Sequence, residues 1–134
     1  MHDVVQDQWL RLLANAGDPR RIGRSMFVVP CATMLRTAYA HPRLQVLFPW
    51  MGMGELHFSW CTEQPWTWDI PYIAPTSDGR FLVAGPLRSQ IVGHADSAHD
   101  AVAMVVDRLP PECGKAFVGT PAELVVHERK DERG

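Results

Sequence analysis

Long apolar segments, a surplus of basic residues and a secretion signal are all missing from this 134-residue sequence. No stretch of about 18 uncharged apolar residues occurs, so no membrane-spanning helix is expected. Residues 1–8 lack both a basic start and an apolar core, so we expect no signal peptide. Lysine and arginine number 13 against 15 acidic residues, a formal net charge of −2, so nucleic acid is not an expected partner.

Cysteines and cofactor-binding motifs are scarce as well. The three cysteines, Cys31, Cys61 and Cys113, are an odd number without a CxxC pair, which fits neither a disulfide framework nor a standard zinc pattern. The sequence contains no GxGxxG, Walker or GxSxG motif, so we expect no bound cofactor. Together these absences predict a cytoplasmic protein with free thiols.

One short stretch concentrates side chains that could bind a metal: His94, Asp96, His99 and Asp100. Their spacing matches no zinc signature of defined geometry. Asp96 and Asp100 are better explained as negative charges at the start of a helix, where the helix dipole favours them. We therefore predict no metal site.

Apolar residues make up 46% of the chain and charged residues 21%, which is typical of a globular domain. The spacing of apolar residues predicts helices over residues 4–16 and 30–41 and a last helix between Ser97 and Pro110. Alternation between turn residues predicts strands over residues 56–61, 66–73, 80–84 and 89–94. Residues 42–54 are expected to be irregular and to pack over an edge of the core. For residues 119–126 the sequence predicts either a strand or a helical turn.

These elements predict an α+β fold in one domain, residues 1–126. Its antiparallel sheet has three to four strands, with N-terminal helices and a C-terminal helix packed on one face, because short turns join antiparallel neighbours. Residues 127–134 are mostly charged and are expected to form a disordered tail.

A turn centred on Glu63 would fold residues 56–73 into a hairpin with defined cross-strand pairs. It pairs His57 with Asp69 and gathers the indoles on the opposite face. A carboxylate that orients an imidazole is the arrangement of acid–base sites, so His57 and Asp69 are the candidate catalytic residues. The alternative, which the sequence favours, is a surface pair worth at most about 1 kcal/mol. Cys61 lies about 13 Å from His57 along the strand, too far for a direct Cys–His dyad.

Tryptophan is abundant: the chain has five, four of them between positions 50 and 68. A pocket with aromatic walls would hold a flat or apolar ligand, and methionine would add adaptable surface. The candidate ligand-binding residues are Trp50, Met53, Trp66, Trp68 and Tyr72. The alternative is that the indoles form the core beneath the helices, which is the favoured interpretation for Trp60.

Several stretches, read in order, carry a family resemblance: DQWLRLL, AYAHPRLQVLFPWMGMGELHFSWCT, DGRFLVAG, DSAHDAVAMVVDRLP and GTPAEL. Over about residues 7–125, the chain resembles a small actinobacterial family of uncharacterised function that is labelled as natural product biosynthesis proteins. The most specific parts are AYAHPRL, the L-x-F-S strand and the final helix ending in RLP. The resemblance implies a bacterial cytoplasm and genes for a specialised metabolite nearby. It assigns no catalytic residue.

The first hypothesis is an accessory protein of a natural-product pathway that binds a hydrophobic intermediate, as a cofactor-independent cyclase or isomerase. Such a protein can act by holding a flexible substrate in reactive geometry. The alternative is a non-catalytic protein-interaction module, an adaptor or immunity-type partner, with residues 44–53 as an exposed apolar patch. A conventional hydrolase or metalloenzyme ranks third, because no nucleophile–base pair or ligand set has usable spacing. The expected partners are thus a small molecule or another protein, including a second copy of the chain, and not a membrane.

Overall fold

The computed structural model describes residues 3–16, 28–52, 54–62, 70–85, 87, 89–109, 116–119 and 122–123. The helices are α1 (Val4–Ala16), α3 (Val28–Ala40) and α4 (Ala98–Asp107). The strands are β1 (Phe48–Gly52), β2 (Glu55–Ser59), β3 (Tyr72–Pro75), β4 (Phe81–Ala84) and β5 (Ile91–Ala95). Cys113 and the expected tail, residues 127–134, lie outside the described residues.

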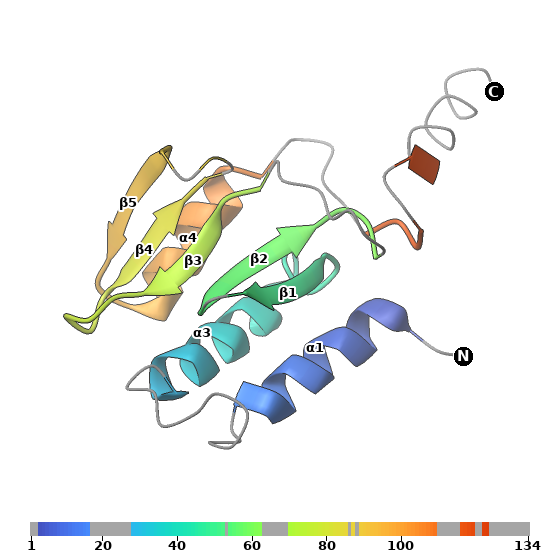
Figure 1. The fold of residues 1–134 in the computed structure, drawn as a ribbon, viewed down its shortest axis with the longest axis horizontal. Helices are drawn as coiled ribbons and strands as arrows, with labels where there is room; N and C mark the ends of the chain where they lie inside the picture. The colour runs from blue at the N-terminus through green and yellow to red at the C-terminus, as the bar shows by residue number, and fades with distance from the viewer. Residues whose placement is uncertain are drawn as a thin grey trace.

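The five strands form one antiparallel sheet in which each strand lies beside its neighbours in the sequence (Figure 1). Helix α1 packs on β1, helix α4 packs on β3, β4 and β5, and α3 lies between the two helices and contacts both. The core joins these helices to Leu56, Ile73 and Val83, which the strand register places on one face of the sheet. The predicted α+β class is confirmed, and the described sheet has one strand more than the largest number expected.

Helix α1 has the bounds that the sequence predicted, and its first turn shows why. The Asp3 carboxylate accepts hydrogen bonds from the backbone N–H groups of Val5 and Gln6, both at 3.1 Å, and so caps the helix. Two side chains then fix the helix to the chain before and within β1. The indole N–H of Trp9 donates to the Leu47 carbonyl at 3.0 Å, and the Gln8 amide donates to the Pro49 carbonyl at 3.0 Å.

Helix α4 also follows its sequence pattern. The Ser97 hydroxyl accepts a hydrogen bond from the Asp100 backbone N–H at 3.1 Å, which is the capping contact expected from this pair. Its buried residues recur at helical spacing, on the part of the helix that packs on the sheet and on α3: Ala98, Ala101, Val102 and Val105. None of the helices within the described part of the chain is long and apolar enough to cross a membrane.

The expectation of an irregular segment over residues 42–54 is wrong for its second half, where strand β1 forms an edge of the sheet. Its proline, Pro49, is tolerated because an edge strand leaves one row of backbone groups outside the ladder. In the connection from β1 to β2, Gly54 takes the left-handed φ of +80°. Leu44, Leu47 and Phe48 are buried, so this segment belongs to the core and is not an exposed apolar patch.

The predicted hairpin register is wrong as well. The turn centred on Glu63 predicts that Leu56 pairs with Ile70. In the structure Leu56 pairs with Ile73, a shift of three residues. The tight turn assumed at Glu63 fixed the predicted register, whereas β3 begins only after Pro71, which cannot donate to the ladder. Because side chains alternate along a strand, a shift by an odd number of residues moves each side chain to the other face of the sheet.

Candidate functional site

Three rings from three adjacent strands stack on the sheet face opposite the helices. We call Trp50, His57 and Tyr72 the ring ladder. The Trp50 and His57 rings lie 4.0 Å apart between centroids and are within 9° of parallel. The His57 and Tyr72 rings lie 4.8 Å apart at 28°. The imidazole is thus held between an indole and a phenol ring.

The strand register explains why these rings meet. Trp50 on β1 is paired directly with His57 on β2. The pairing of Leu56 with Ile73 places Tyr72 beside His57 on the other side. His57 follows Leu56, a core residue on the helix face, so the pleat turns His57 to the opposite face. His57 and Tyr72 are each only 4% exposed, whereas Trp50, on the edge strand, is partly exposed.

Two glycines leave room for the outer rings of the ladder. A Cβ on Gly52 would lie 3.1 Å from Cζ3 of Trp50, so the indole leans over a position that has no side chain. A Cβ on Gly85 would lie 3.2 Å from Cδ1 of Tyr72. Gly85 also has a φ of +107°, which L side chains rarely adopt. The sequence therefore allows these rings to lie close to the backbone at both ends of the ladder.

Glu55 supplies the carboxylate of the site. Its Oε1 lies 3.1 Å from Nε2 of His57, and the two side chains are 13% and 5% exposed. In the neutral imidazole this contact places the proton on Nε2, which donates to Glu55 and fixes the plane of the ring. Glu55 is not among the predicted site residues, although residues two apart on a strand share a face and the sequence reads Glu-Leu-His.

The structure brings together only part of the predicted site. Trp50, His57 and Tyr72 meet as described, and Tyr72 is the residue beside His57 on β3. The remaining predicted site residues lie outside the described part of the chain: Met53, Trp66, Trp68 and Asp69. Trp60 is partly buried and packs against the hydrophobic core, in agreement with its favoured interpretation.

The described thiols do not extend the site. Burial raises the pKa of the Cys31 thiol above its ordinary value, which disfavours the reactive thiolate. Cys61 is fully buried, and its backbone N–H donates to the Ser59 hydroxyl at 3.1 Å. The same hydroxyl donates to the Cys61 carbonyl at 2.9 Å. Ser59 therefore serves to hold the end of β2.

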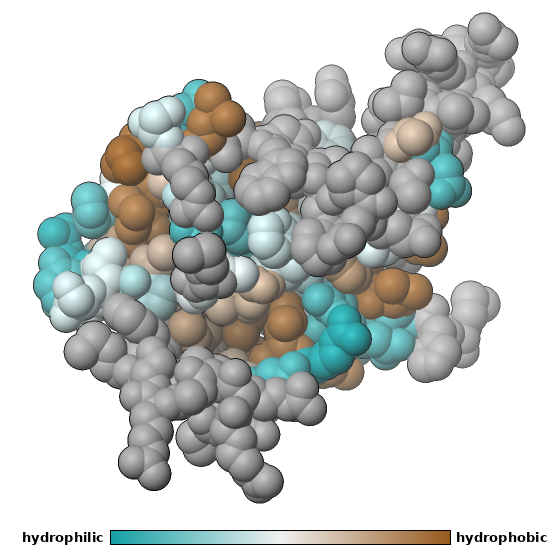
Figure 2. Space-filling view, viewed as in Figure 1, coloured by the Kyte–Doolittle hydropathy of each residue, from teal (hydrophilic) through white to brown (hydrophobic). Residues whose placement is uncertain are grey.

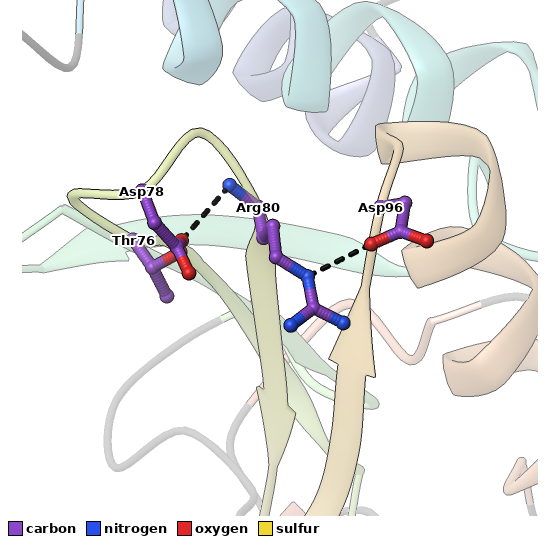
Figure 3. A network of polar contacts seen from close by, with 4 residues as sticks. All are labelled: Thr76, Asp78, Arg80 and Asp96. Carbon is purple, nitrogen blue, oxygen red and sulfur yellow. Dashed lines mark hydrogen bonds and ion pairs between the residues drawn. The ribbon is translucent and has the colours of Figure 1, made fainter.

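Asp96, one of the residues considered for a metal site, has a structural role. Arg80 Nε donates to the Asp96 carboxylate at 2.8 Å, which joins the start of β4 to the residue after β5 (Figure 3). At the preceding turn, the Asp78 carboxylate accepts from the Thr76 hydroxyl and from the Arg80 backbone N–H. The Thr76 bond is the main reason that the pKa of Asp78 is lowered. Within the described residues, no group of three or more His, Cys, Asp or Glu side chains is placed to hold a metal ion.

Comparison with known proteins gives a family without an assigned activity. The model of one family, described as a family of unknown function, DUF6193, matches residues 3–120, which include all eight helices and strands named above. Searches of the curated proteins and of the solved structures found no match. The chain therefore belongs to the DUF6193 family of unknown function.

Proposed function

We propose that the protein binds a flat, hydrophobic small molecule at the Trp50 end of the ring ladder, where His57 handles a proton of the ligand. The observation that carries the proposal is the His57 imidazole, stacked between Trp50 and Tyr72 with Glu55 at its Nε2. The family resemblance supports a natural-product pathway as the setting and an intermediate of such a pathway as the ligand.

The ladder offers a flat ligand a surface of the right kind. Aromatic pairs in offset-stacked or edge-to-face contact contribute about 0.5–1.5 kcal/mol beyond the area that they bury. Because Trp50 is partly exposed on edge strand β1, the indole is the member of the ladder that a flat ligand would reach from solvent. The buried rings of His57 and Tyr72 then serve as a rigid support beneath the indole.

The same arrangement fits a cyclisation or isomerisation without a cofactor. These reactions need a substrate held in one conformation and a group that gives or takes a proton. The Glu55 contact and the two neighbouring rings hold the imidazole in one orientation. Here Glu55 is a positioning residue, and His57 is the proposed catalytic residue for a substrate that stacks on Trp50 and extends past the indole to the edge of the imidazole.

Ligand binding can be tested by NMR with 2-naphthol, a flat probe that carries one hydroxyl group. We expect saturable shifts of the Trp50 indole N–H and of the His57 ring protons. Trp50→Leu, which keeps an apolar side chain but removes the ring, should abolish them. Trp60→Phe is the matched control and should bind as the native protein does. Shifts that survive Trp50→Leu, or no saturable shift at the ladder, would contradict the proposal.

A second candidate function, protein interaction, is favoured by a different surface from the one expected. Leu44, Leu47 and Phe48 are buried, but Leu87 and Ile91 are 64% and 57% exposed. Ile91 lies on β5, the edge strand opposite β1, and Figure 2 shows hydrophobic surface over this part of the sheet. Ile91→Lys should abolish any association detected by sedimentation, whereas Leu10→Lys, at an exposed position on α1, should not.

A further inference from the structure

A groove lies between α3 and α4, and no residue of the sheet lines it. Its volume is about 680 Å³. Pockets that hold small molecules commonly measure about 300–1,000 Å³, so the groove has the capacity of a ligand site. It is separate from the ring ladder, whose three residues all come from β1, β2 and β3.

The groove exists because small side chains occupy its rims. Ala40 on α3 and Ala103 on α4 both line it, are exposed and end at Cβ. Val102 and Val106, four residues apart on α4, lie on one face of the helix and give the groove an apolar lining. A ligand with a branched apolar body would cover these two valines.

The groove also carries one fixed charge of each sign, on different helices. Arg36 lines it from α3 and Asp107 lines it from α4. Arg36 donates from Nε to the Ala32 carbonyl at 3.3 Å, which leaves the two terminal nitrogens of its guanidinium for a ligand. Among the described residues, neither Arg36 nor Asp107 takes part in an ion pair.

A polar donor completes the lining. The His41 ring accepts a hydrogen bond at Nδ1 from the Arg43 backbone N–H at 3.1 Å. The proton of the neutral ring is therefore on Nε2, which can donate to an acceptor in the groove that His41 lines.

We propose that this groove binds a small zwitterion with an apolar body, the chemistry shared by a free apolar amino acid and an apolar dipeptide. Its carboxylate pairs with Arg36, its ammonium group pairs with Asp107, and its side chain covers Val102 and Val106. A ligand of one charge sign would leave either Arg36 or Asp107 beside a like charge. The site does not depend on the ring ladder or on the function proposed for it.

The experiment measures binding of L-leucyl-L-leucine by titration calorimetry and by NMR shifts of α3 and α4. N-acetylated and C-amidated forms of the dipeptide each remove one charge, and each should bind about two to five times more weakly, since both protein charges are exposed. A second titration measures the binding of free leucine for comparison with the dipeptide. If it binds more tightly than the dipeptide, the natural ligand is a single amino acid; if the dipeptide binds more tightly, the ligand is a peptide.

Variants assign each charge to its partner. Asp107→Asn should bind the dipeptide and its acetylated form equally, because the partner of the ammonium group is gone. Arg36→Gln should likewise lose the distinction between the dipeptide and its amide. Arg80→Gln removes an exposed charge outside the groove and should bind as the native protein does.

Filling the groove tests its location. Ala103→Leu and Ala40→Leu introduce good helix formers at exposed positions, so both variants should fold, and both should lose binding. Three results would overturn the proposal. The first is that neither free leucine nor the dipeptide binds at millimolar concentration. The second is that Ala103→Leu and Ala40→Leu both bind as well as the native protein, and the third is that acetylation still weakens binding to Asp107→Asn.

Discussion

Replacement of Gly85 by alanine tests whether this glycine is needed to seat the ring ladder. Two effects act on the new methyl group. The φ of +107° is unfavourable for an L side chain, and the methyl would lie 3.2 Å from Cδ1 of the buried Tyr72 ring. It would also lie 3.4 Å from the Pro71 Cα, a backbone atom that cannot move aside easily.

Together these effects should lower the free energy of unfolding of Gly85→Ala by about 2–4 kcal/mol, from backbone strain and from crowding of a packed site. Gly79→Ala is the matched control. Gly79 has a φ of +83°, but a Cβ there would meet no atom within 4 Å. It should therefore show only the backbone effect of about 1–2 kcal/mol. The gain from a stiffer unfolded chain is the same for both variants and cancels in their difference.

The assay is urea unfolding followed by tryptophan fluorescence, combined with NMR of the His57 ring protons. These protons sense the ring currents of Tyr72, 4.8 Å away between centroids. Gly85→Ala should shift them and Gly79→Ala should not. Equal loss of stability in the two variants, with unchanged His57 signals in Gly85→Ala, would refute the claim that Gly85 makes room for Tyr72.

Three further predictions concern other parts of the fold. Ser97→Ala removes the cap of α4 and should lower the free energy of unfolding by about 1 kcal/mol, measured by urea denaturation; no change would show that the Asp100 N–H is satisfied otherwise. Hydrogen bonds lower the pKa of Asp78 below its ordinary value of 3.8. The ionised carboxylate should therefore stabilise the folded protein fully above pH 3.8, and this stabilisation should be lost as the pH falls through the lowered pKa of the folded state. The urea midpoints of the native protein and Asp78→Asn should thus converge in acid, and a gap that is constant with pH would contradict this. Burial raises the pKa of the Cys31 thiol, so an aromatic disulfide reagent at pH 8 should modify it only after urea is added, as counted against Cys31→Ser; rapid modification of the folded protein would show that the site opens.

The helices could be predicted from the sequence because their signals are local. The spacing of apolar residues and the caps at Asp3 and Ser97 both act within a few residues of each other. The bounds of α1 agree with the prediction at both ends, and those of α3 and α4 differ by a few residues.

Strand β1 and the partners of β2 could not be predicted in the same way. A proline and a glycine in residues 48–52 conceal a strand that is stable only because it lies at the edge and is fixed to α1. Strand register depends on where a loop begins and ends, and the segment between β2 and β3 is longer than the turn inferred at Glu63. The ring ladder follows from these two non-local facts, so only its members, and not their arrangement, could be inferred.

Because every strand of the sheet pairs with the strand next to it in the chain, the sheet can assemble by successive closure of short loops. Such local closures are fast, because the residues that they bring together are close in the sequence. The contacts of Gln8 and Trp9 with the backbone 41 and 38 residues away are of a different kind. We expect a folding transition state in which the strands from β2 to β5 are already joined, and in which docking of the first helix onto β1 completes the molecule.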